Sequence, residues 1–138
     1  MSESLERRRQ MLRTAMGRTI GAALADPDVI EIMVNPDGVL RLDRLGTGRV
    51  DTGIRLSAVD VERIIRVVAS HVRLEAHRDN PLISAELETG ERFEGVLPPV
   101  ALAPCFAIRK PASRVYRLGD YVASPSTAFR TTMTTAWR

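Results

Sequence analysis

The feature that most constrains the fold is a run of alternating apolar and polar residues between positions 80 and 110. Apolar residues occupy every second position from Ile83 to Leu87, a turn signal follows at residues 88–91, and the alternation then resumes. A third alternating stretch covers residues 105–110. Period-two alternation is typical of strands that bury one face. The run therefore predicts three consecutive antiparallel strands.

Two arginines lie at matched positions in these predicted strands. Phe93, Phe106 and Ile108 fall on the face expected to enter the core, whereas Arg92 and Arg109 fall on the opposite face. If the strands pair as predicted, both guanidinium groups emerge together on the outside of the sheet. Such a pair can bind an anion through charge-assisted, bidentate hydrogen bonds.

Glutamates crowd the same hairpin and leave a second interpretation of the arginines open. They occur at four positions: Glu86, Glu88, Glu91 and Glu94. Paired carboxylates can perform acid–base catalysis, but no nucleophile or metal-ligand set accompanies them, so a solvated hairpin edge is favoured. Arg92 and Arg109 could equally pair with Glu91 or Glu94.

The rest of the chain predicts two helices and a further hairpin. Apolar residues three and four apart indicate an amphipathic helix from about Leu5 to Ala25, and another over residues 57–74, with Ser57 as its N-cap. Between them, residues 29–34 and 39–45 flank the turn at 35–38 and predict a hairpin. The expected fold is α+β, a single domain with two helices on a mostly antiparallel sheet of five or six strands.

Composition limits the possible functions. The chain has 138 residues, a net charge of +3 and 4% aromatic residues, so it is one domain with few rings for stacking bases. Direct nucleic-acid binding is therefore not expected.

The single cysteine, Cys105, cannot form an internal disulfide, and a buried thiol in a reducing compartment is expected. The histidines are six apart and lack partner ligands, so no metal site is expected.

The lysine content excludes one kind of nucleotide site. Lys110 is the only lysine in the chain, and it follows Arg109 rather than a glycine. A P-loop requires a lysine directly after its last glycine, so the sequence contains no Walker A motif. The glycines at 46 and 48 are expected to belong to a loop after a strand.

Several short motifs together resemble a known family. They are Val29-Ile30-Glu31-Ile32-Met33-Val34-Asn35-Pro36, Pro81-Leu82-Ile83, Gly90-Glu91-Arg92-Phe93, Pro98-Pro99 and Ile108-Arg109-Lys110-Pro111. In this order and spacing they are similar to the N-terminal domain of the traffic ATPases of type IV secretion and conjugal transfer, the TrbB type in particular. One departure is the turn at residues 87–90, which lacks a proline after its leucine.

The resemblance implies a role within a larger machine. Residues 1–121 would form the N-terminal domain of a hexameric ATPase, and residues 122–138 an irregular or disordered tail, interpreted as the mark of a truncated or frameshifted gene. In the family, ATP lies between this domain and the P-loop domain. Arg92 and Arg109 match the arginines that approach its phosphates, and no catalytic residue is assigned to this chain.

The same resemblance sets expectations for cofactors, partners and location. ATP and Mg²⁺ would be held only in the context of a full-length protein, and this chain alone would not hydrolyse ATP. Partners would be further copies in a ring and other secretion components at the inner membrane. The location would be cytoplasmic, with peripheral attachment to the inner membrane also open. The alternative is a stand-alone interaction module that binds and regulates full-length ATPase rings.

Overall fold

The structure is a computed structural model that describes residues 2–77 and 79–111. The boundary expected at residue 121 and the tail expected at 122–138 lie outside these ranges. In chain order the elements are α1 (Ser2–Ala25), β1 (Val29–Val34), β2 (Val39–Arg44), β3 (Gly48–Arg55), α2 (Ala58–His71), β4 (Leu82–Glu86), β5 (Arg92–Val96) and β6 (Cys105–Arg109). No helix in the described ranges has the length and hydrophobicity needed to cross a bilayer.

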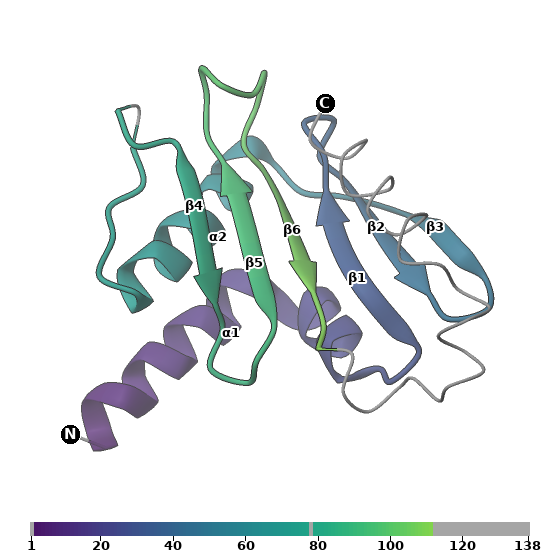
Figure 1. Ribbon diagram of the computed structural model, residues 1–138, viewed down its shortest axis with the longest axis horizontal. Coiled ribbons are helices and arrows are strands. Elements are labelled where there is room, and N and C mark those ends of the chain that lie inside the picture. The colour runs from purple at the N-terminus through teal and green to yellow at the C-terminus, as the bar shows by residue number, and fades with distance from the viewer. Residues whose placement is uncertain (1, 78, 112–138) are drawn as a thin grey trace.

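The six strands form one sheet in the order β3-β2-β1-β6-β5-β4, and every neighbouring pair is antiparallel. Strands β1 to β3 form one meander and β4 to β6 a second, and the two meet where β1 pairs with β6. Both helices lie on one face of the sheet, behind it in Figure 1. The prediction of an α+β domain with three strands between residues 80 and 110 is confirmed.

The core lies between the sheet and the helices. Ser57 caps α2 as predicted, because its hydroxyl accepts a hydrogen bond from the backbone N–H of Asp60 at 3.1 Å. Helix α2 buries its apolar stripe against the sheet, where Phe93 and Phe106 stack with ring centroids 5.4 Å apart. The alternation of residues 82–110 therefore places its apolar members in the core, as expected.

Two local features differ from the sequence-based expectation. Helix α1 is interrupted at Gly17, whose φ of 80° is one that glycine adopts without steric cost. No strand was predicted after the turn at residues 45–47, yet β3 begins at Gly48 and pairs with β2. Strand β3 is an edge strand and most of its residues are exposed, so its sequence lacks a marked apolar alternation.

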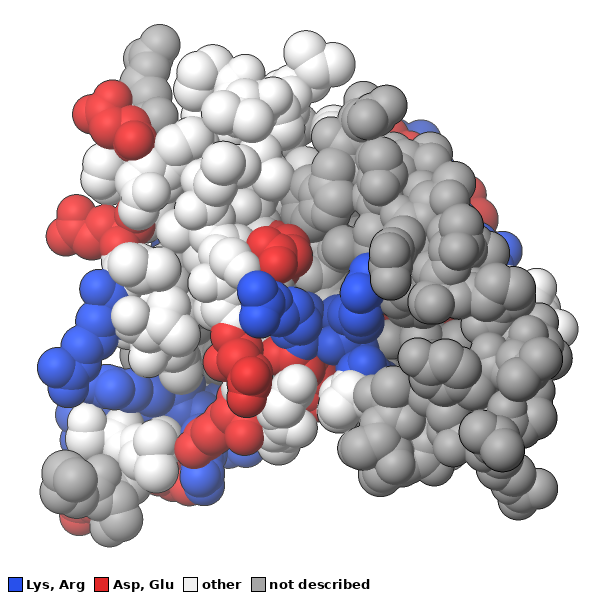
Figure 2. Space-filling model, viewed as in Figure 1, with Lys and Arg blue, Asp and Glu red and all other residues white. Residues whose placement is uncertain are grey.

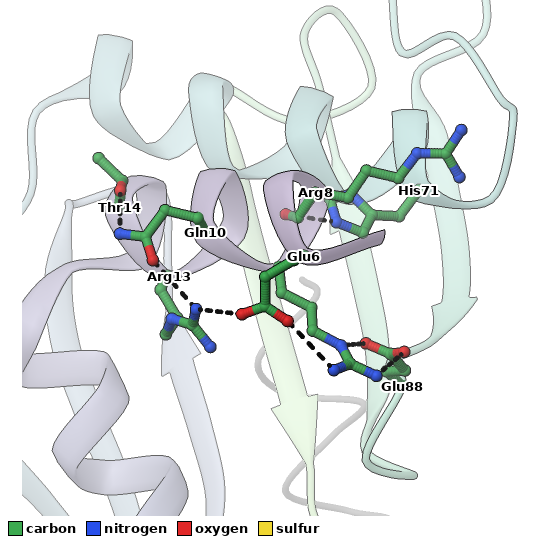
Figure 3. A network of polar contacts seen from close by, with 8 residues as sticks. Glu6, Arg8, Gln10, Arg13, Thr14, His71 and Glu88 are labelled. Carbon is green, nitrogen blue, oxygen red and sulfur yellow. Dashed lines mark hydrogen bonds and ion pairs between the residues drawn. The ribbon is translucent and has the colours of Figure 1, made fainter. Parts of the chain in front are cut away.

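Contacts from α1 to the hairpin and to α2 hold the N-terminal helix in place (Figure 3). Arg9 donates two hydrogen bonds to Glu88, from Nε at 2.8 Å and from an Nη at 2.7 Å. The ring nitrogens of His71 lie 2.8 Å from the carbonyl oxygens of Val67 in α2 and of Arg8 in α1. The arginine hydrogen bonds lower the pKa of Glu88 below its usual value.

Gly95 in β5 is required by close packing. A Cβ at this position would lie 2.9 Å from Phe93 and 3.1 Å from Ile65, closer than side chains normally approach. We expect Gly95→Ala to lower the free energy of unfolding by about 1 to 3 kcal/mol, since an extra methyl group must displace core side chains. Urea unfolding followed by circular dichroism measures this. Gly21→Ala in α1, with nothing within 4 Å, is the control, and it should not destabilise the protein.

Candidate functional site

A row of charged residues crosses the outer face of the sheet, the face opposite α1 and α2. The backbone register aligns one residue from each strand in this charged row: Arg49, Asp43, Glu31, Arg109, Arg92 and Glu86, in the order β3-β2-β1-β6-β5-β4. Basic and acidic side chains lie next to one another near the centre of the view in Figure 2. The row combines residues from both meanders and contains both arginines that the sequence analysis singled out.

Arg92 and Arg109 are direct cross-strand partners in β5 and β6. Directly opposed residues have Cβ atoms about 5 Å apart, and two like charges at that spacing repel each other. The Arg92 side chain is 62% exposed and its Nε lies 3.3 Å from Glu94, whereas Arg109 is partly buried next to Glu31. The structure therefore brings the two arginines together on the outer face.

The hairpin glutamates do not gather into one site. Glu88 pairs with Arg9 of α1, and Glu91 is buried and accepts a hydrogen bond from the Thr89 hydroxyl. Glu94 contacts Arg92 and also accepts a hydrogen bond from Ser84 at 3.0 Å. Of the two acids proposed as alternative partners for the arginines, Glu94 contacts Arg92 and Glu91 turns to Thr89. The exposed Arg92–Glu94 pair is of a kind that contributes little energy.

Glu31 is a buried member of the charged row that sequence reasoning did not single out. It is 0% exposed, and neither carboxylate oxygen accepts a hydrogen bond from the described residues. Burial raises its pKa to about 7, with Arg109 and Arg49 opposing the shift and Asp43 adding to it. The available signal was a lone acid inside the β-branched run of residues 29–34, because a charge in a buried strand requires a partner.

Two neighbouring guanidinium groups can bind an anion through charge-assisted hydrogen bonds. Among the described residues, no three histidines, cysteines or acids are grouped to hold a metal ion. Cys105 is buried and its pKa is raised to about 11 by burial, so the thiol is unreactive near neutral pH. A hollow of about 190 Å³ between α1, α2 and β4 is lined by neither Arg92 nor Arg109. The arginine pair thus lies outside this hollow, on the face of the sheet.

The fold and the sequence are both similar to those of known proteins, although no protein-family model matches. The chain is 46% identical over 114 residues to the conjugal transfer protein TrbB of Rhizobium radiobacter, and 34% identical over 104 residues to the type IV secretion system protein VirB11 of Bartonella henselae. These matches cover 82% and 73% of the chain, but only 35% and 29% of the relatives. The chain thus spans about a third of the length of the curated relatives it matches.

A solved structure has the same fold. The VirB11 ATPase of the Brucella suis type IV secretion system, determined in complex with sulphate, superposes with a TM-score of 0.74 at 24% identity, over 88% of this chain and 36% of that one. The chain belongs to the VirB11-like traffic ATPases and corresponds to their N-terminal part. Within that family its sequence is similar to the TrbB proteins, including the probable TrbB of Sinorhizobium fredii, at 46% identity.

Proposed function

We propose that this chain forms the N-terminal domain of a hexameric ATPase of conjugal transfer or type IV secretion, and that Arg92 and Arg109 contact the phosphates of ATP. The observation that carries the proposal is their direct opposition on β5 and β6. The domain would act in the cytoplasm at the inner membrane, with other copies in a ring and with further secretion components. The names of its relatives, TrbB and VirB11, support this setting.

Two neighbouring like charges can share a ligand of opposite charge. Two guanidinium groups held on adjacent strands repel each other, and a phosphate between them converts that repulsion into two attractions. Arginine stays charged at every physiological pH and presents a planar fork that matches phosphate oxygens. In phosphoryl transfer, an arginine in this position stabilises the charge on the transferring group.

A complete nucleotide site needs parts that the described residues do not supply. Hydrolysis requires Mg²⁺ ligands and a residue that positions water, and among the described residues no group of acids or histidines is arranged for a metal. In the proposed full-length protein, ATP and Mg²⁺ would be held between this domain and a nucleotide-binding domain. The chain alone would contribute phosphate contacts and subunit contacts without turnover.

Titration of this chain with inorganic pyrophosphate tests the phosphate contacts directly. We expect the Nε–Hε NMR signals of Arg92 and Arg109 to shift together, with a Kd of roughly 1 mM, since two charge-assisted contacts contribute about 2 kcal/mol each. Arg41 is the matched control, because it lies on the same face and its guanidinium is already bound by Asp37 at 2.8 and 3.2 Å. Its signal should not move.

Two outcomes decide the proposal. Loss of binding in Arg92→Ala and in Arg109→Ala, with Arg41→Ala binding normally, supports it. Equal weakening in all three variants indicates only a general attraction of anions to a basic protein, and it contradicts a defined site. Circular dichroism of each variant verifies that the sheet is intact.

A further inference from the structure

Glu31 lies where it can control one of the two arginines. It is the direct cross-strand partner of Arg109 in the β1–β6 pair, while Arg92 is the partner of Arg109 on the other side. The three residues therefore lie side by side on the outer face, with Arg109 in the middle. Glu31 is fully buried, and its carboxylate accepts no hydrogen bond from the described residues.

We propose that Glu31 regulates the anion affinity of the arginine pair: its carboxylate competes with a bound phosphate for Arg109, so anion binding is accompanied by proton uptake at Glu31. The inference rests on the proposed phosphate role of Arg92 and Arg109. It adds a regulating residue on β1, which belongs to the other meander. Glu31 is thus a positioning residue that acts through Arg109.

Competition follows from the geometry of the row. A buried carboxylate is stable only when nearby positive charge compensates for lost hydration, and Arg109 contributes the larger share of that charge, ahead of Arg49. A phosphate bound by Arg109 is attracted by the same guanidinium charge that stabilises the Glu31 carboxylate. It also brings a second negative charge close to Glu31. Uptake of one proton by Glu31 removes both conflicts, because the neutral acid neither needs the guanidinium nor repels the phosphate.

The charged groups around Glu31 set its pKa close to neutral pH. Arg109 on β6 and Arg49 on β3 favour the carboxylate, whereas burial and Asp43 on β2 favour the neutral acid. The balance gives a pKa of about 7, so both forms are populated near neutral pH. Its neighbours on the outer face of β1 and β6, Met33 and Ala107, do not titrate.

The test uses sulfate, since its charge stays constant between pH 6 and pH 8 and any pH dependence must come from the protein. We expect sulfate to bind this chain about fivefold more tightly at pH 6 than at pH 8, if the bound anion raises the pKa of Glu31 by about one unit. The ¹³C signal of the Glu31 carboxyl group, followed by NMR, should titrate at higher pH when sulfate is present. This second readout reports the coupling at the residue itself.

Variants separate this inference from the proposed function. Glu31→Gln should bind sulfate at pH 8 as tightly as the unsubstituted chain does at pH 6, with little pH dependence. Glu62→Gln, in α2 and paired with Arg66, is the matched control and should keep the full pH dependence. A sulfate site that requires Arg92 and Arg109 but keeps its pH dependence in Glu31→Gln overturns the inference alone. Sulfate binding that is unaffected by Arg92→Ala and Arg109→Ala overturns the proposed function instead.

Discussion

A chimera carrying Arg92→Ala or Arg109→Ala is expected to hydrolyse ATP at least about 100-fold more slowly than the unsubstituted chimera. In the chimera, residues 1–111 of this chain replace the matching segment of full-length TrbB from Rhizobium radiobacter, which is 46% identical over the aligned residues. The unsubstituted chimera is expected to hydrolyse ATP and provides the reference rate. Steady-state phosphate release gives kcat and KM for each variant.

The expected loss reflects what an arginine does as a phosphoryl group moves. Charge on the transferring group grows toward the transition state, so removing a guanidinium aimed at it lowers kcat more than it raises KM. Replacing either arginine with lysine should restore only part of the rate, because an ammonium group lacks the planar fork.

Arg41→Ala supplies the comparison within the same face of the sheet. Its guanidinium is engaged by Asp37, so the rate should stay within about twofold of the reference. If Arg92→Ala and Arg109→Ala both behave like Arg41→Ala, the arginine pair has no part in hydrolysis.

Glu31→Gln is expected to stabilise the protein by roughly 3 kcal/mol at pH 8 and to change its stability little at pH 4. Burial raises the pKa of Glu31 from an ordinary value of 4.5 to about 7, so the folded protein holds the proton more tightly than the unfolded chain. The native protein therefore loses stability as the pH rises from 4.5 to 7. Glutamine cannot ionise, and the variant should escape that loss.

Urea unfolding at pH 4, 6 and 8 measures the effect, with the gap between the two proteins widening as the pH rises. Glu62→Gln is again the control, since the Glu62 side chain is 40% exposed and its pairing with Arg66 contributes less than about 1 kcal/mol. A gap that is the same at every pH would falsify the assignment of an elevated pKa to Glu31. It would indicate instead a difference in packing between the two side chains.

The strands around the arginines could be predicted because one face of each is buried. Phe106 and Ile108 in β6 repeat with period two, and Phe93 is their buried counterpart in β5. Because neighbouring residues of a strand face opposite sides, Arg92 and Arg109 lie on the other face. The sequence does not state which strands are neighbours, yet the short connections within residues 82–109 favour consecutive pairing. The juxtaposition of the two arginines followed from these local rules.

The role of Glu31 and the presence of β3 could not be predicted from these local rules. The position of Glu31 beside Arg109 depends on pairing between β1 and β6, whose residues are more than 70 positions apart in the chain. Strand β3 lies at an edge and contains Asp51 and Gly53, residues that are depleted in strands. The break at Gly17 was hidden because apolar spacing continues on both sides of it.

The pairing of β1 with β6 has a consequence for assembly of the domain. Glu31 and Arg109 lie in strands of different meanders, and neither meander contains both. Each meander can form its own hairpins early. Pairing of β1 with β6 closes a long loop, so this step of folding is slow. Newly made protein should acquire its ability to recognise anions only once β6 has been inserted between β1 and β5.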